Sequence, residues 1–327
     1  MQSQGQPPPN QTKRRMASRI SRSAALGLAA VTMLAPRRAR SQTSPIRIGT
    51  GVAATQAEAY YAEQLGVFKQ AGIATTQTIV TRGNDTLASI VRGDLDVGST
   101  TPQGIANAII HGVPIQIIAT GAVFAGDPAP VQFVVSKKAP IRNDAAAYER
   151  ATIAVQTLND SQSVGVLQWF RRNHVDTSKL RFIEIPFSAI AAAVDRGEVT
   201  AGCQVEPFIS TNRDVVREVP HVYDSLGHHW ALGAWYARKD WIEKNASLVK
   251  TLVAALYATA KRVNGAPASI DELLSAYSKI PLSAVHAINK PIWAEAAERS
   301  QVEPQIQAAA AFNAISRPVS YHEMTGG

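Results

Sequence analysis

The sequence predicts an α/β fold of two similar lobes, each a mainly parallel sheet covered by helices, with a ligand cleft between them. Short aliphatic runs alternate with helical patterns from residue 45 onward, which is typical of parallel sheets. A repeated stretch indicates two related units, because residues 92–99 read RGDLDVGS and residues 196–203 read RGEVTAGC. The 327 residues are enough to build both units with ample core.

The first set of elements extends from residue 46 to residue 120. Its expected strands are 46–49 (IRIG), 76–80 (TQTIV), 95–99 (LDVGS) and 114–120 (PIQIIAT). Thr55 and Glu58 have the spacing of a capping box, in which a hydroxyl and a carboxylate satisfy free amides at a helix start. Asn84 or Asp85 is expected to cap the second helix, and Pro102 suits the first turn of the third.

The second set begins at residue 152. Its expected strands are 152–157, 181–185, 200–207 and 221–226, and its expected helices are 161–173 and 189–195. Residues 131–140 and 231–242 read as two crossing strands that join the lobes, and the amphipathic run 248–263 belongs to a helical C-terminal wrap. The predicted organisation is lobe one from 42–134 plus 231–327, with the helical wrap, and lobe two from 135–230.

The repeated stretch has a local explanation. Its first glycine, Gly93 or Gly197, is expected to end a helix in the left-handed conformation. A short buried strand follows, and the second glycine, Gly98 or Gly202, is expected to let the chain turn at the carboxyl end of that strand. The stretch therefore predicts the same frame in both lobes rather than a chemical motif.

Residues 1–41 have the layout of an export signal. A basic segment (13–22) precedes an apolar run (24–35) that is shorter than the roughly 20 residues of a membrane span, and cleavage is expected near Ser41. The pair Arg14-Arg15 leaves twin-arginine export open, although the residues after it fit general secretion better.

Charge and cysteine content support export of a freely soluble protein. The first 41 residues hold eight of the 33 Lys and Arg residues, which leaves 25 against 25 Asp and Glu, so the net charge of +8 belongs to the signal and does not indicate nucleic-acid binding. Cys203 is the only cysteine, so an intramolecular disulfide and an N-terminal lipid anchor are both excluded. The periplasm is the expected location.

Small hydroxyl and amide side chains follow the predicted strands, where ligands bind in open α/β sheets. The unsatisfied amides and the dipole of the helix that starts there favour an anion or another strong acceptor. Taken singly, each of these residues could be a plain helix cap. The candidate ligand-binding residues are Thr55, Gln56, Arg82, Asn84, Ser99, Thr100, Thr101, Thr157, Asn159, Asp160, Ser161, Gln162 and Glu206.

The sequence offers little for catalysis, a metal or a cofactor. His228 and His229 are the only clustered histidines, and neighbours in a strand point to opposite faces. Residues 49–54 fit the G-x-G-x-x-A pattern of dinucleotide sites, but the second strand ends without the acidic residue that such sites use. We therefore expect no catalytic residues, no metal and no cofactor.

Four segments resemble periplasmic substrate-binding proteins of ABC importers for aliphatic sulfonates, taurine and nitrate. They are 59–73 (AYYAEQLGVFKQAGI), 88–119 (ASIVRGDLDVGSTTPQGIANAIIHGVPIQIIA), 193–208 (AVDRGEVTAGCQVEPF) and 235–256 (WYARKDWIEKNASLVKTLVAAL). The resemblance implies a type II periplasmic binding protein, with two Rossmann-like lobes and a two-strand hinge. It also implies ligand contacts at Thr55, Gln56, Ser99 to Thr101 and the 159–162 turn, and a Glu206 that faces the cleft.

The resemblance implies a monomeric receptor that passes a small organic anion to a membrane permease of an ABC transporter, most simply a sulfonate such as an alkanesulfonate or taurine. The sequence departs from the sulfonate pattern after the first strand (GVAATQ, 51–56) and at residues 199–201, which leaves the ligand open. A pyrimidine-precursor-binding protein or a cofactor-dependent synthase of the same fold is the alternative, although the synthase group's cysteine-rich element is absent. A sensor role is also open.

Overall fold

The computed structural model describes residues 44–80, 83–125, 127–140 and 143–326, without the side chains of residues 83 and 84. The expected export signal (1–41) lies outside these residues and stays a prediction. Within the described chain, none of the helices combines the length and the apolar character that crossing a membrane requires.

The first sheet has the strand order β2-β1-β3-β12-β4. Its strands are β1 (Ile46–Thr50), β2 (Thr75–Ile79), β3 (Val97–Thr100), β4 (Ile115–Thr120) and β12 (Ala234–Arg238). Strands β2, β1 and β3 are parallel, and β12 runs antiparallel between β3 and β4. The helices of this lobe are α1 (Glu58–Gln64), α2 (Val67–Gln70), α3 (Gly83–Arg92), α4 (Pro102–Ile110), α7 (Lys239–Lys244) and α8 (Ala246–Gly265), preceded by the short 3₁₀ helix η1 (Ala54–Gln56).

The second sheet repeats this arrangement, with the order β10-β6-β9-β7-β8. Its strands are β6 (Val131–Ser136), β7 (Thr152–Val155), β8 (Arg181–Glu184), β9 (Ala201–Val205) and β10 (Val216–Val219). Strands β8, β7 and β9 are parallel, and β6 runs antiparallel between β9 and β10 as β12 does in the first sheet. The helices are α5 (Ser161–Arg172), α6 (Phe187–Asp195), η2 (Ala145–Tyr148), η3 (Thr177–Lys179), η4 (Ser210–Asn212) and η5 (Tyr223–Leu226).

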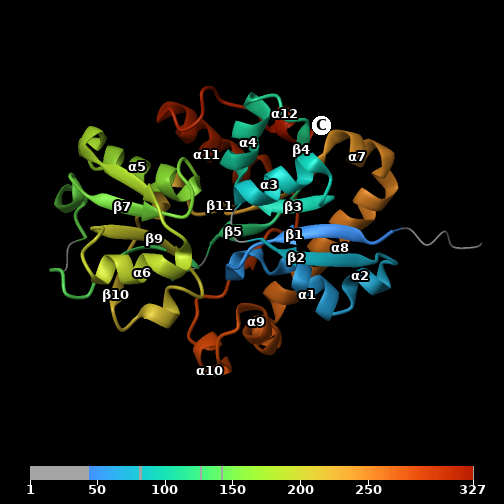
Figure 1. Ribbon diagram of the computed structural model, residues 1–327, viewed down its shortest axis with the longest axis horizontal. Coiled ribbons are helices and arrows are strands. Elements are labelled where there is room, and N and C mark those ends of the chain that lie inside the picture. The colour runs from blue at the N-terminus through green and yellow to red at the C-terminus, as the bar shows by residue number, and fades with distance from the viewer. Residues whose placement is uncertain (1–43, 81–82, 126, 141–142, 327) are drawn as a thin grey trace, which may run out of the picture. The chain divides into compact units, whose positions relative to one another are not determined.

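The predicted α/β fold with two lobes is confirmed (Figure 1). Several details differ from the expectation. Residues 221–226 are not the fourth strand, because β10 takes that place and η5 follows it. Strand β6 begins at Val131, so the chain enters the second sheet before the expected boundary at 134–135. Thr55 and Glu58 form no capping box, because Thr55 lies in η1 and α1 starts without a side-chain cap.

A small third sheet joins the lobes. It consists of β11 (Trp230–Ala231), β5 (Ala122–Phe124) and β13 (Ile292–Trp293), in that order and all antiparallel. The expected crossings, 131–140 and 231–242, mostly belong to the large sheets instead, because they contain β6 and β12, and only Ala231 of β11 lies in the small sheet. Strands β5 and β13 were not expected.

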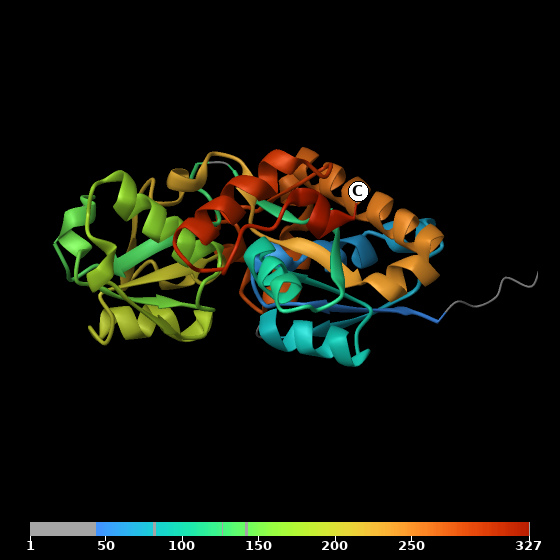
Figure 2. The ribbon, with the colours of Figure 1, turned by 90° about the horizontal axis from the view of Figure 1, so that it is seen from above.

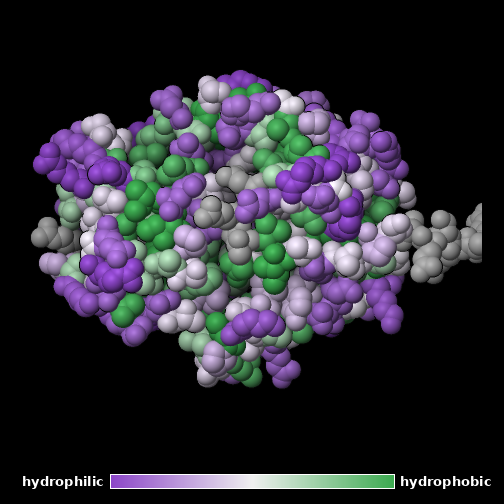
Figure 3. Space-filling view, viewed as in Figure 1, coloured by the Kyte–Doolittle hydropathy of each residue, from purple (hydrophilic) through white to green (hydrophobic). Residues whose placement is uncertain are grey.

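The C-terminal segment contacts both lobes. It contains η6 (Pro267–Ile270), α9 (Asp271–Ser278), α10 (Leu282–Val285), α11 (Arg299–Ala311) and α12 (Tyr321–Thr325). Helix α11 packs against α4 of the first lobe and α5 of the second, and Figures 1 and 2 show it beside both. On the face seen in Figure 3, hydrophobic side chains gather between the lobes and hydrophilic ones cover the two outer ends.

The repeated stretch occupies equivalent places in the two lobes. Gly93 and Gly197 follow α3 and α6 with φ of +82° and +74°, so the expected left-handed helix ends are confirmed. The expectation for the second glycine was wrong, because Gly98 and Gly202 lie inside β3 and β9. A Cβ on Gly98 would lie 2.6 Å from Thr86, and one on Gly202 would lie 2.2 Å from Ile190. These glycines let the preceding helix approach the strand closely.

Candidate ligand-binding site

A cleft of about 390 Å³ lies between the two large sheets. From lobe one it is lined by residues after β1 and β3, and from lobe two by residues after β7 and β8. These are the carboxyl ends of parallel strands, where backbone amides and helix starts converge. The topology therefore builds the cleft from two equivalent edges that face each other.

Most of the sequence-predicted residues lie in the wall of this cleft. They are Thr55, Gln56, Ser99, Thr100, Thr101, Thr157, Asn159, Asp160, Ser161 and Gln162. Arg82 and the side chain of Asn84 lie outside the described residues. The structure thus brings together ten candidates from both lobes, and their contact with a ligand stays a prediction.

Helix α4 presents its first turn to the cleft. Thr101 is its N-cap, with a side-chain oxygen that accepts a hydrogen bond from the Gly104 amide at 3.2 Å, and Pro102 follows in the first turn as the sequence indicated. Ser99 and Thr100 precede the cap and also line the cleft. Two hydroxyls and a helix start therefore converge on one side of the site.

Helix α5 presents its first turn from lobe two, but a carboxylate of the protein already occupies that end. Asp160 is the N-cap, and its Oδ1 accepts hydrogen bonds from the Ser163 amide at 2.8 Å and the Ser163 hydroxyl at 3.1 Å. Burial raises the pKa of Asp160 to about 6, against the lowering effect of the bonds from Ser163 and Gln162. An anionic group at this end would meet the Asp160 carboxylate when it is ionised.

The charged side chains of the lining are mainly acidic. Glu184, at the end of β8, lines the cleft beside Asp160, and its Oε1 accepts a hydrogen bond from the Leu158 amide at 2.9 Å. Among the lining residues that the structure describes, there is no lysine or arginine, and His111 is the only imidazole. A ligand anion would therefore be held by amides, hydroxyls and the α4 helix start.

Several lining residues were missed, among them Gln103 and Phe187. Gln103, in the first turn of α4, and Phe187, at the start of α6, both face the cleft. Gln103 belongs to a buried network in which its Nε2 donates to Gln305 Oε1 at 2.9 Å and its Oε1 accepts a bond from Ser161 Oγ. Phe187 stacks on Phe208 with ring centroids 6.1 Å apart. A glutamine one position after a helix-starting proline was the available signal for Gln103.

Several large aromatic side chains lie in the core and not in the wall of the cleft. Phe124, Trp230, Trp235 and Tyr236 are buried and are not among the described lining residues. Trp235 Nε1 donates to Glu58 Oε2 at 2.6 Å, and Phe124 stacks on Trp230 with centroids 5.2 Å apart. These four aromatic side chains therefore contribute to core packing.

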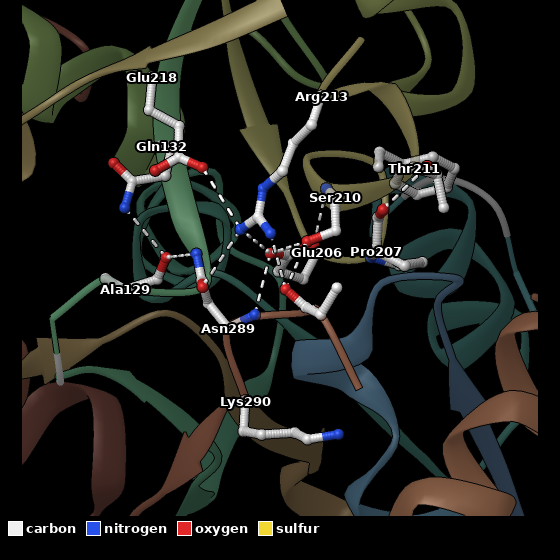
Figure 4. Close-up of polar contacts among 12 residues, drawn as sticks. Ala129, Gln132, Glu206, Pro207, Ser210, Thr211, Arg213, Glu218, Asn289 and Lys290 are labelled. Carbon is white, nitrogen blue, oxygen red and sulfur yellow. Dashed lines mark hydrogen bonds and ion pairs between the residues drawn. The ribbon is translucent and has the colours of Figure 1, made fainter. Parts of the chain in front are cut away.

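Glu206 does not line the cleft, in contrast to the expectation. Val205, the last residue of β9, lines it, and successive side chains of an extended strand point to opposite faces. Glu206 is therefore directed away and is fully buried, where Asn289 and Ser210 donate hydrogen bonds to its carboxylate (Figure 4). Burial raises the pKa of Glu206, while these bonds and nearby Arg213 lower it.

The described residues offer neither a reactive thiol nor a metal-ion site at the cleft. Cys203 lies in the middle of β9, fully buried, and burial raises the pKa of its thiol, so it packs as a small apolar residue. Across the described part of the chain, no three His, Cys, Asp or Glu side chains are placed to share a metal ion.

A family model matches most of the sequence. Residues 39–278 match the model of the NMT1-like family. The chain belongs to the NMT1-like family. No curated protein matches the sequence.

Solved structures share the architecture of this NMT1-like chain. A ligand-binding component of an ABC-type import system from Staphylococcus aureus has a TM-score of 0.75 at 11% identity, covering 86% of this chain and 95% of that chain. The periplasmic aliphatic sulphonate binding protein SsuA from Escherichia coli has a TM-score of 0.69 at 17% identity, with 86% and 91% covered. The nitrate-binding protein NrtA from Synechocystis has 0.69 at 13% identity, with 84% and 83% covered. The two-lobed periplasmic-binding-protein fold predicted from the sequence is therefore confirmed.

Proposed function

We propose that the protein is a periplasmic solute receptor that captures a small organic anion, in the first place a sulfonate, and delivers it as a monomer to the permease of an ABC importer. The observation that carries this proposal is the cleft itself, in which ten polar candidates from two lobes face each other at the carboxyl ends of parallel strands. Binding proteins use such a cleft to enclose a solute from both sides.

The described lining residues are suited to bind an anion through hydrogen bonds, without a positively charged side chain that neutralises it. Ser99, Thr100 and Thr101 offer hydroxyls beside the α4 helix start, and Gln56 and Asn159 offer amide groups from the two lobes. A helix start favours negative charge through its dipole and free amides. The sulfonate and nitrate proteins of similar fold make these anions the first ones to test.

A second class of ligand is favoured by a specific observation. Asp160 and Glu184 put two carboxylates into a wall whose described residues include no lysine or arginine, and Phe187 adds an aromatic face. Carboxylates and an aromatic ring suit a basic heterocycle, such as a pyrimidine precursor, better than an anion. In this case the solute would be neutral or cationic.

Thermal unfolding of the purified protein with a panel of compounds separates these classes. The panel contains ethanesulfonate, taurine, nitrate, acetate and an aminopyrimidine. A compound present at a hundred times its dissociation constant adds about 2.7 kcal/mol of stability, which corresponds to a rise in Tm of roughly 5–10 °C. A rise with sulfonates alone supports the first class, and a rise with the aminopyrimidine alone supports the second. If no compound changes Tm, the proposal is wrong for both classes.

An enzyme on the same scaffold predicts a different result. A cofactor-dependent synthase would turn over a substrate or carry a cofactor through purification. Mass spectrometry and an ultraviolet spectrum of the purified protein detect a bound cofactor directly. A cofactor in stoichiometric amount would replace the receptor proposal by the enzyme.

A further inference from the structure

The segment 287–289 makes a non-covalent connection to lobe two behind the cleft. It follows α10 and precedes β13, the third strand of the small sheet between the lobes. We call residues 287–289 the strap. Figure 4 shows that the polar side chains of lobe two around Glu206 point toward it.

Glu206 is the buried acceptor of this connection. Its Oε1 accepts hydrogen bonds from the Asn289 amide at 3.0 Å and the Ser210 hydroxyl at 2.8 Å, and its Oε2 accepts one from the Ser210 amide at 3.1 Å. The side chain has no exposed surface. Loss of the strap would leave a buried carboxylate with fewer donors, which is unfavourable.

Arg213 adds a second set of contacts to the strap. Its Nη1 donates to the Ala287 carbonyl at 2.8 Å and its Nη2 donates to Asn289 Oδ1 at 3.4 Å. The same guanidinium lies 3.9 Å from the Glu206 carboxylate and 3.6 Å from the Glu218 carboxylate. Arg213 therefore also pairs with acidic side chains of its own lobe. Because the Arg213 side chain is 42% exposed, its removal leaves the core intact.

Further contacts fix the position of the strap. Asn289 Nδ2 donates to the Ala129 carbonyl at 3.2 Å, in the segment between β5 and β6. The next residue, Lys290, pairs with Asp271 of α9 and donates to the Val285 carbonyl at 2.9 Å. Lobe two therefore contacts a segment that is itself held by α9 and α10.

These contacts lie directly behind the ligand cleft. Val205, the neighbour of Glu206, lines the cleft wall, and so does Ala53 on the lobe-one side. The Glu206 carbonyl accepts a hydrogen bond from the Ala54 amide at 2.9 Å, so the two walls meet at this point. A rotation of lobe two that moves Glu206 relative to Ala54 and to the strap would break these hydrogen bonds.

We propose that the contact of Glu206 and Arg213 with the strap is a latch that holds the two lobes in the closed arrangement, and that Glu206 is a positioning residue for the cleft. It affects ligand binding by setting the fraction of molecules whose lobes are closed, because apparent affinity scales with the fraction of binding-competent molecules. The effect on ligand affinity rests on the proposed receptor function, whereas the effect on the lobes does not.

The latch is tested without a ligand by measuring the distance between the lobes. Spin labels are attached to cysteines introduced by Lys69→Cys on α2 and Arg172→Cys on α5, both exposed, while the native Cys203 is buried and stays unlabelled. The parent protein is expected to give one short distance. Glu206→Ala and Arg213→Ala are expected to add a second, longer one.

Glu218→Gln is the matched control, because Glu218 contacts Arg213 but, among the described residues, forms no hydrogen bond or ion pair with the strap. It is expected to keep the parent distance. Hydrogen exchange gives a second readout, in which the peptide containing Asn289 exchanges about ten-fold faster in Arg213→Ala, as expected for the loss of contacts worth one ordinary hydrogen bond or more.

The outcomes separate the latch from the receptor function. Unchanged distances and unchanged exchange in folded Arg213→Ala and Glu206→Ala overturn the latch. If Glu206→Ala fails to fold, Arg213→Ala alone decides. If the distances change but ethanesulfonate, nitrate and an aminopyrimidine all fail to bind the parent protein, the latch is confirmed and the proposed ligand classes are wrong.

Discussion

Ser161 Oγ donates a hydrogen bond to Gln103 Oε1, and this bond joins the first turn of α5 in lobe two to the first turn of α4 in lobe one. Gln305 of α11 completes the group, because its Oε1 lies 3.1 Å from the same hydroxyl and its Nε2 donates to the Ala231 carbonyl at 3.0 Å. All three side chains are buried. The cleft wall therefore contains a buried polar contact between the lobes.

Replacing Ser161→Ala is expected to lower the free energy of unfolding by about 1–3 kcal/mol, because the buried Gln103 Oε1 loses its hydroxyl donor. Denaturant unfolding followed by circular dichroism measures the difference. Ser300→Ala is the control, since Ser300 also lies in the first turn of a helix but is exposed, and its change should stay within about 0.5 kcal/mol. Equal stability of the two variants would contradict a structural role for the bond.

Asp160→Asn is expected to remove a pH dependence of stability while preserving the helix cap, because asparagine also caps well. Burial raises the pKa of Asp160 from 3.8 to about 6 in the folded protein. The folded state therefore binds the proton more tightly than the unfolded state does. The stability that this protonation contributes is fully present below about pH 4 and is lost as the pH rises through 6. The loss is at most about 3 kcal/mol.

Unfolding free energies measured between pH 4 and pH 8 test the direction of this pH dependence. Relative to the parent, Asp160→Asn should gain stability as the pH rises and then remain constant above about pH 7. Asp144→Asn is the control, since Asp144 caps a short helix from an exposed position. A constant difference between Asp160→Asn and the parent over the whole range would refute the assignment.

The fold followed from local signals, whereas part of the site depends on contacts that local signals do not encode. Gly93 and Gly197 indicated two helix ends, and the polar residues after β3 and β7 indicated the two walls of the cleft. The bond between Gln103 and Gln305 joins residues 202 positions apart, and a glutamine in a helix has no pattern that reveals such a partner.

The direction of Glu206 shows a second kind of limit. The sequence placed it near the carboxyl end of a buried strand, expected at 200–207, but which face it points to depends on where β9 ends and on Asn289, 83 positions away. Strand β13 was missed for a similar reason, since two residues are too short to show a period.

Glu58→Gln is expected to stabilise the protein at alkaline pH. Glu58 is buried, its Oε2 accepts the bond from Trp235 Nε1, and within the described residues its Oε1 has no hydrogen-bond partner. Burial raises the pKa of Glu58 from 4.5 to about 8, so its contribution to stability is fully present below about pH 4.5 and is lost as the pH rises through 8. Glutamine keeps an acceptor for Trp235 and cannot ionise.

Denaturant unfolding at pH 6 and pH 9 measures this effect. Between the two pH values, the free energy of unfolding should fall by a few kcal/mol more in the parent than in Glu58→Gln. This difference is on the order of what a pKa shift of this size implies. Glu243→Gln, at an exposed position of α7, should behave like the parent. If Glu58→Gln and the parent lose equal stability, the carboxyl group is not the source of the pH dependence.

Gly98→Ala and Gly202→Ala are expected to destabilise the two lobes by a similar mechanism. The new methyl group would meet Thr86 and Ile90 at 2.6 and 2.8 Å in the first lobe, and Ile190 at 2.2 Å in the second. Forcing an extra methyl into a packed core costs about 1–3 kcal/mol. Gly265→Ala is the control, because a Cβ there meets nothing within 4 Å, so its stability should stay equal or rise slightly. Thermal unfolding compares the three variants. A loss of stability in Gly98→Ala and Gly202→Ala but not in Gly265→Ala would establish that the repeated stretch serves helix–strand packing. Full stability with impaired ligand binding would instead make the stretch part of the binding site.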